Sequence, residues 1–154
     1  MMFKGSHPVT IDTKGRFAVP AAYRQPLSDD CGGRLVVTRH WDGCLLIYPS
    51  REFESFEQKL LARGSLDPKV RNIQRFFIGN ARDVDMDRQG RVLLPSNLRE
   101  SAGLVSHAVL SGIGNLFELW DAERFEARNQ STADELAADA NAGELPDVLM
   151  DISL

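Results

Sequence analysis

Apolar and polar residues alternate along two stretches of the chain that share one pattern. In residues 9–19 the alternation runs on both sides of a glycine, Gly15, and residues 84–94 repeat this arrangement around Gly90. Alternation with a period of two is typical of β-strands, and a glycine between two such runs is typical of a turn. Each stretch therefore predicts a β-hairpin.

The two stretches also share identical residues around their turns. At an offset of 75 the matching pairs are Val9/Val84, Asp12/Asp87, Gly15/Gly90, Arg16/Arg91, Pro20/Pro95 and Arg24/Arg99. The last position of a three-residue hairpin loop favours the left-handed conformation, so we expect Gly15 and Gly90 to adopt it. The Asp and the Arg flank each turn and can pair across it, and the proline suits the start of a helix. The chain thus contains an internal repeat of hairpin and short helix.

Each repeat continues with the same elements. In the first repeat the sequence predicts a helix from about Pro20 that ends near Pro26, because an internal proline removes a helix hydrogen bond. Strands are predicted at residues 35–38 and 44–48, with a turn at residues 40–43 between them. The second repeat predicts a helix at 95–102, a strand at 108–111, a turn at 112–115 and a strand at 116–120. After it, Asp121 can cap a further helix.

Two helical patterns separate the repeats. From Ser50 apolar residues recur at helical spacing until Gly64, and Asp67 and Pro68 then supply the cap and first turn of a second helix. The connector is therefore expected to be a helical hairpin, whose basic residues form its solvated face. A unit of some forty residues buries too little surface to be stable alone, so we expect both repeats to share one core around a pseudo-twofold axis. The expected parts are residues 5–51 (first repeat), 52–79 (connector), 80–123 (second repeat) and 124–154 (C-terminal helix and acidic tail).

The net charge of -4 conceals an uneven distribution. All 18 basic residues lie within residues 1–128, whereas residues 129–154 carry six of the 22 acidic residues and no basic one. We expect this tail to lose order, or to dock only through its last apolar stripe, Leu145, Val148, Leu149 and Ile152. The acidic tail accounts for the negative total, which therefore does not argue against nucleic-acid binding by the rest of the chain.

Several functional classes lack their usual patterns in this sequence. It has no G-x-S-x-G, H-E-x-x-H or G-x-x-x-x-G-K-[ST] motif, so no catalytic residues are expected. Cys31, Cys44 and three scattered histidines favour neither a disulfide framework nor a metal site. No segment is long and apolar enough to cross a membrane, and the start lacks a secretory apolar run. We expect a cytoplasmic protein without a cofactor, a metal or a small-molecule substrate.

Taken together, these motifs resemble the MraZ family, bacterial transcriptional regulators built from two SpoVT-AbrB domains. The resemblance rests on both D-x-x-G-R hairpins, the Y-P and L-W-D segments, the L-D-P-K-V-R-N-I-Q-R helix start and the duplication. It covers Phe3 to about Phe125 and the closing D-I-S-L. It implies an α+β, mainly β fold, a duplicated swapped-hairpin AbrB-like β-barrel with peripheral helices. It also implies a nucleoid-associated, ring-shaped homo-oligomer that binds repeated elements in double-stranded DNA upstream of the division and cell-wall gene cluster.

The two hairpin tips are the candidate DNA-binding site. A tip projects beyond its sheet, so Lys14 and Arg16, like Arg88 and Arg91, can offer cations to phosphates and guanidinium groups to guanine edges. In the family that the chain resembles, the paired D-x-x-x-R motifs are associated with DNA contact. The supporting turn residues are Asp12, Gly15, Asp87 and Gly90. The structural alternative is that each Asp–Arg pair only staples its turn.

Two other interpretations stay open at this point. An antitoxin-like module of the same barrel class would bind DNA and also bind a toxin through a disordered tail, and a structural oligomer would have no nucleic-acid role. The helical connector and the folded second repeat argue against the first, and the duplicated cationic tips argue against the second. Arg24 and Arg99 also recur, but on the helices after the tips, where packing is as plausible as phosphate contact. We leave them out of the site.

Overall fold

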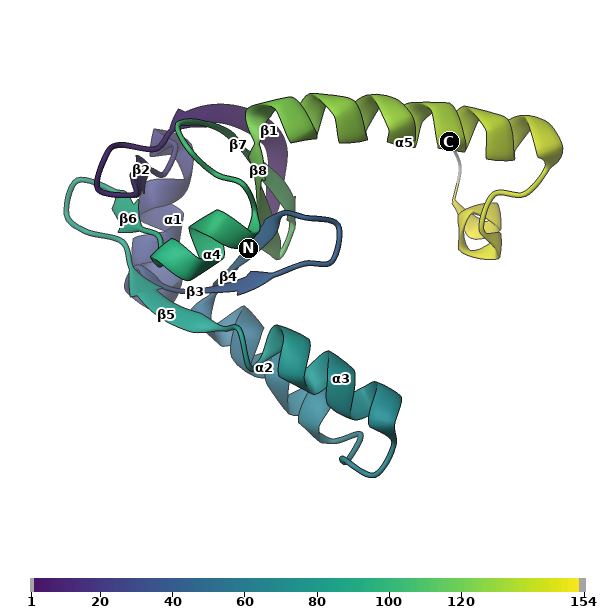
Figure 1. Cartoon of the computed structure of the whole chain (residues 1–154), viewed down its shortest axis with the longest axis horizontal. Coiled ribbons are helices and arrows are strands. Elements are labelled where there is room, and N and C mark those ends of the chain that lie inside the picture. Colours follow the sequence, from purple (N-terminus) through teal and green to yellow (C-terminus); the bar gives the residue numbers. More distant parts are fainter. Residues whose placement is uncertain (1, 153–154) are drawn as a thin grey trace. The chain divides into compact units, whose positions relative to one another are not determined.

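The computed structural model describes residues 2–152 and contains two compact units, Met1–Ala122 and Glu123–Leu154 (Figure 1). The first unit holds both repeats and the connector, and the second holds the C-terminal segment. The finer division into four parts stays a prediction.

Strands and helices follow one another in the first unit in the order that the repeat predicts. The strands are β1 (Phe3–Thr10), β2 (Arg16–Ala18), β3 (Arg34–Arg39), β4 (Leu45–Pro49), β5 (Arg82–Asp85), β6 (Arg91–Leu93), β7 (His107–Gly114) and β8 (Leu116–Asp121). The helices are α1 (Ala21–Cys31), α2 (Ser50–Leu61), α3 (Pro68–Phe77) and α4 (Ser96–Ser101). All the strand pairs formed by these elements are antiparallel.

The sheet topology has the symmetry of the repeat. One sheet has the order β1-β7-β8-β4-β3-β5, and β2 and β6 form a separate two-stranded ribbon. The equivalent strands of the two repeats are β1 and β5, β3 and β7, and β4 and β8. They occupy mirror-image places in this order, counted from its two ends. The ribbon pairs Phe17 with Val92, and β4 pairs Leu46 with Glu118 of β8. Because the residues of each pair occupy equivalent positions in the two repeats, the pseudo-twofold axis passes through both pairs.

The two arms of each hairpin pair with the other repeat instead of with each other. β1 pairs with β7, β5 pairs with β3, and β2 and β6 pair together. A local ladder between the arms was therefore a wrong expectation, whereas the swapped hairpin implied by the resemblance agrees with this pairing. A lone two-stranded hairpin is marginally stable. The exchange makes β1 and β5 the edge strands of the six-stranded sheet and joins β2 to β6 in the ribbon. Only the turns themselves remain local.

The core is shared by the two repeats, as expected. One cluster of buried side chains contains residues of both, each at most 2% exposed: Phe17, Leu27 and Leu45 from the first repeat and Val92, Leu98 and Leu119 from the second. The duplicated α+β fold is thus confirmed. Its strands form an open sheet and a ribbon instead of one closed ladder, and the helices hold more residues than the strands.

Helix α1 is longer than the sequence predicted. It continues through Pro26 and ends at Cys31. The proline costs one helix hydrogen bond, but Leu27 and Cys31 are buried in the core. Gly32, with a φ of 63°, then ends the helix, and its N–H donates to the carbonyl of Ser28 at 3.0 Å. Packing and capping therefore outweigh the local cost of the proline.

The connector is the helical hairpin that the sequence predicted. Asp67 caps α3, because its Oδ1 accepts the N–H of Lys69 at 2.8 Å, and Pro68 occupies the first turn. Helix α2 packs against α3 through an edge-to-face contact between Phe56 and Phe77, whose ring centroids are 5.4 Å apart. Ser50 is the first residue of α2 and makes no side-chain cap, in contrast to its expected role.

The C-terminal segment consists of α5 (Ala122–Ala142) and a short 3-10 helix, η1 (Asp147–Asp151). We expected order to be lost from residue 129, but the helix continues to Ala142. Residues with high helix propensity, mainly alanine, explain this continuation. In the last apolar stripe, Val148 and Ile152 are exposed. Among the described residues, no helix combines the length and the apolar character needed to span a membrane.

Candidate functional site

The first hairpin tip is a compact turn organised by Asp12. Its Oδ1 accepts the backbone N–H groups of Lys14 and Arg16, both at 2.9 Å, and its Oδ2 accepts the Arg16 Nε–H at 2.8 Å. Gly15 has the predicted left-handed conformation, with a φ of 88°. The backbone N–H of Asp12 donates to the carbonyl of Arg16 at 2.8 Å and closes the turn. One aspartate thus orders both the turn and the arginine side chain.

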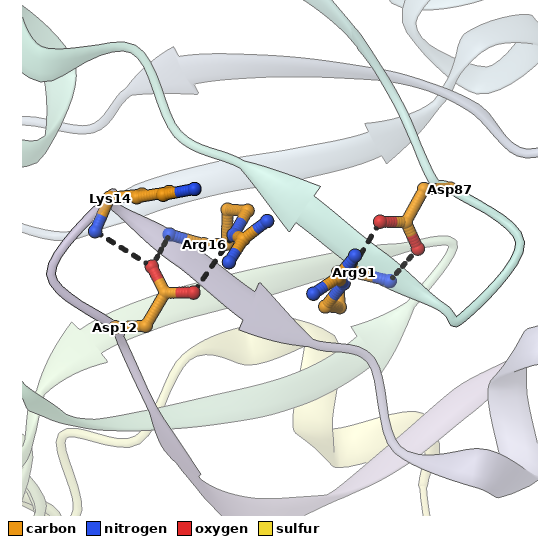
Figure 2. A network of polar contacts seen from close by, with 5 residues as sticks. All are labelled: Asp12, Lys14, Arg16, Asp87 and Arg91. Carbon is orange, nitrogen blue, oxygen red and sulfur yellow. Dashed lines mark hydrogen bonds and ion pairs between the residues drawn. The ribbon is translucent and has the colours of Figure 1, made fainter.

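The second tip has the same geometry. Asp87 Oδ1 accepts the N–H groups of Gln89 and Arg91, at 2.9 Å and 2.8 Å, and Oδ2 accepts the Arg91 Nε–H at 3.0 Å. Gly90 has a φ of 78°. Figure 2 shows both aspartates directed toward the arginines of their own turns. The two motifs are therefore equivalent in structure as well as in sequence.

The hydrogen bonds of the turns lower the pKa of both aspartates below the ordinary value. The backbone hydrogen bond from Arg16 is the main cause that lowers the pKa of Asp12, and the backbone bond from Arg91 does the same for the pKa of Asp87. The arginine side chains and the second backbone N–H of each turn add to this effect, and desolvation opposes it. The Asp–Arg bond engages only Nε, so the N–H groups on the two terminal nitrogens remain available to a ligand.

The ribbon places both arginines on one face. In the β2–β6 ladder Arg16 lies opposite Leu93 and Arg91 lies opposite Ala18, while the intervening pair points to the other side. That other side is the core, where Phe17 is buried. Arg16 and Arg91 keep 29% and 39% of their side-chain surface exposed. We call Arg16, Ala18, Arg91 and Leu93 the ribbon face.

The remaining cations occupy different places on the two tips. Lys14 and Arg88 are both exposed in the turns. They are not equivalent, because Lys14 corresponds to Gln89, and Arg88 corresponds to Thr13. The two tips thus present similar arginines near the ribbon and differently placed cations at their ends.

The structure brings together residues that the sequence analysis did not connect. The four predicted cations were assigned to two independent tips, whereas the ribbon joins Arg16 and Arg91 in one surface. Ala18 and the 55% exposed Leu93 belong to that surface and were not predicted as site residues. The alternation in R-F-A-V and R-V-L-L was the available signal, since it places residues 16 and 18, and 91 and 93, on the same side of each strand.

Comparison with known proteins gives relatives over most of the chain, among them three named transcriptional regulator MraZ. The one from Thioalkalivibrio sulfidiphilus is 51% identical over 120 residues, which cover 78% of this chain and 80% of that protein. The one from Nitrosospira multiformis is 49% identical over 130 residues, or 84% and 88% of the two chains. The one from Nitrosomonas eutropha is 43% identical over 153 residues, or 99% and 100%.

A family model agrees with these relatives. The model of the MraZ protein, whose description also calls it antitoxin-like, matches residues 2–76 and again residues 77–144. The two successive matches correspond to the internal repeat of the sequence and to the pseudo-twofold symmetry of the sheet. The chain therefore belongs to the MraZ family.

Proposed function

We propose that this protein is a transcriptional regulator that binds specific sequences of double-stranded DNA through the ribbon face and the two tips. The observation that carries the proposal is the pair of aspartate-held arginines, Arg16 and Arg91, on the exposed side of one ribbon. The relatives named as transcriptional regulators support it.

The two-stranded form and the side chains of the ribbon suit the major groove of DNA. This groove admits a two-stranded β-ribbon, and an arginine can donate two hydrogen bonds to the O6 and N7 atoms of guanine. The terminal nitrogens of Arg16 and Arg91 supply these donors. Leu93 and Ala18, between them, offer apolar contact to thymine methyl groups. Lys14 and Arg88, at the ends of the tips, neutralise phosphates.

The aspartates give these arginines selectivity as well as order. A fixed guanidinium loses less freedom on binding and meets a base edge in a defined direction. A carboxylate beside the arginine also repels phosphate, so the pair disfavours attachment that ignores the sequence. Stapling the turn and orienting the arginine are two effects of the same bond, so the pair that holds the turn also serves the proposed contact with DNA.

A single ribbon contacts few base pairs, so the proposed regulator acts as a homo-oligomer on repeated elements. In a ring of protomers, binding of the first ribbon makes later contacts intramolecular, and such linkage can raise affinity about 100 to 10,000-fold. Consistent with its family, we propose target elements upstream of the division and cell-wall gene cluster and a location in the cytoplasm, associated with the nucleoid.

A footprint on the DNA upstream of the protein's own gene tests the proposal. Purified protein should protect several short, regularly spaced elements, and affinity should fall sharply when all but one are scrambled. Light scattering coupled to size exclusion gives the mass of the assembly. Absence of any protected element at low salt would refute DNA binding. A 17.1 kDa monomer that binds one element as tightly as several would refute the oligomeric part.

An antitoxin-like role is the second candidate, favoured by the description of the family model. It would add a toxin as protein partner, held by the C-terminal segment. Helical structure up to Ala142 leaves little of that segment in the disordered form that such binding usually employs. Deletion of residues 123–154 separates the roles, because an antitoxin would lose its partner whereas DNA binding by the first unit should persist.

A further inference from the structure

Arg24 and Arg99 occupy equivalent positions on α1 and α4, and each lies beneath the hairpin tip of the other repeat. A Cβ atom built on Gly90 would be 2.5 Å from Arg24 Cδ, and one built on Gly15 would be 3.0 Å from Arg99 Cζ. Both glycines are buried. Each arginine thus fills a space that is open only because the tip of the other repeat has a glycine there.

The backbone reinforces this crossed arrangement. The N–H of Val19 donates to the carbonyl of Gly90 at 2.8 Å, and the N–H of Leu94 donates to the carbonyl of Gly15 at 3.0 Å. Val19 lies between the ribbon and α1, so the segment that leads to Arg24 is already bonded to the tip that Arg24 supports. The same holds for Leu94 and Arg99.

The inner ends of the two arginine side chains differ in their hydrogen bonding. Arg24 Nε donates to the carbonyl of Val19 at 2.7 Å. Arg99 Nε is buried and, alone among the buried side-chain nitrogen and oxygen atoms of the described residues, has no hydrogen-bond partner. The side chain of Arg24 is therefore fixed by a hydrogen bond to its own repeat, whereas the Nε of Arg99 is placed by packing alone.

We propose that Arg24 and Arg99 are positioning residues that fix each tip to the opposite repeat and so set the directions of the DNA-binding arginines. Arg24 supports the tip that carries Arg91, and Arg99 supports the tip that carries Arg16. The part that concerns DNA rests on the proposed function, and the crossed mechanical coupling does not. The competing role is direct contact of Arg24 and Arg99 with phosphates.

Amide hydrogen exchange without DNA tests the coupling. Arg24→Ala should speed the exchange of the Arg91 amide, which donates to Asp87, about tenfold or more, and leave the Arg16 amide unchanged. Arg99→Ala should have the opposite pattern. Equal effects of one variant on both tips, or no effect on the tip of the other repeat, would overturn the proposal. Because each variant serves as the control for the other, a general loss of stability cannot imitate the crossed result.

A double-mutant cycle gives an independent measurement. Gly90→Ala should lower the melting temperature, partly because the new methyl group displaces Arg24. In an Arg24→Ala background this decrease should be smaller by about 2 °C or more, and in an Arg99→Ala background it should be unchanged. Additive effects in both backgrounds would overturn the proposal. If Gly90→Ala does not fold, Gly15→Ala, which meets Arg99 at a longer distance, gives the mirror cycle.

DNA binding then distinguishes positioning from phosphate contact. Arg24→Lys keeps the charge but replaces the flat guanidinium, so a positioning role predicts a loss of affinity of about tenfold with an almost unchanged salt slope. A phosphate contact predicts near-normal affinity for Arg24→Lys, and a salt slope lower by about one for Arg24→Ala. The pattern expected for a phosphate contact would overturn the proposal. If the wild-type protein binds no DNA, the proposed function fails, and hydrogen exchange alone decides the coupling.

Discussion

Removal of one ribbon arginine should separate DNA recognition from folding. In Arg16→Ala the guanidinium disappears, while the turn keeps its backbone bonds to Asp12 and the left-handed Gly15. A bidentate contact with guanine contributes about 1 to 3 kcal/mol, so affinity for the specific element should fall about 5 to 160-fold. Arg91→Ala should have an effect of the same size, because the equivalent tip has the same geometry.

Stability should change little in both variants. The Asp–Arg pairs are partly exposed, with 29% and 39% of the arginine side chains accessible, and such pairs contribute little to folding. We expect the melting temperature to move by less than about 4 °C. Differential scanning fluorimetry gives this value, and fluorescence anisotropy with specific and scrambled DNA gives the affinities.

Arg71→Ala is the matched control for these variants. It removes the same charge from an exposed position on α3, outside the ribbon face. Its specific affinity should stay within about twofold of the wild type, apart from a small general salt effect. Wild-type affinity in Arg16→Ala and Arg91→Ala, with normal melting, would refute the assignment of the ribbon face. A collapse of stability in either variant would refute the claim that these arginines are dispensable for folding.

Three further predictions concern charge, pH and packing. Lys14→Ala should weaken binding to all DNA sequences alike and lower the salt slope by about one, measured by anisotropy at several salt concentrations. Folding lowers the pKa of Asp12 and Asp87 below the ordinary value of 3.8. Their contribution to stability should therefore be complete above pH 3.8 and should disappear as the pH falls through the lower pKa of the folded state. NMR titration of the two carboxyl groups would contradict this prediction if they titrated above pH 3.8. Phe17→Ala should cost about 3 to 5 kcal/mol in urea unfolding, whereas Leu93→Ala, on the exposed face of the same ribbon, should cost far less.

The turns were predictable from sequence because they depend on local interactions. Asp12 accepts bonds from residues two and four positions further on, and Gly15 needs a left-handed conformation, so both features are visible in five consecutive residues. The pairing of the arms was not visible. An alternating strand offers the same apolar side to any partner, and residues 17 and 92 pair although 75 positions separate them. Only the resemblance to a known family indicated the swap.

Helix ends were mispredicted where tertiary packing or propensity outweighed a local signal. Pro26 was expected to end α1, but burial of Leu27 and Cys31 continues it. The tail was expected to lose order, or to dock only through its last apolar stripe, yet its helix formers extend α5 to Ala142. The ribbon face was missed because it is formed by one strand from each repeat. Its residues could not be grouped without knowing that β2 and β6 pair with each other.

The fused repeats also predict the orientation of the DNA elements. Two identical tips related by a true twofold axis would favour a palindrome, but here Thr13 and Lys14 on one tip correspond to Arg88 and Gln89 on the other. In the proposed complex each protomer therefore has a direction on DNA. Protomers that repeat by rotation around a ring keep that direction from one to the next, so the elements should be direct repeats. Inverting one element of a pair should reduce the avidity to that of a single site, measured by anisotropy on otherwise identical DNA. Equal avidity for direct and inverted pairs would show that the difference between the tips does not affect recognition.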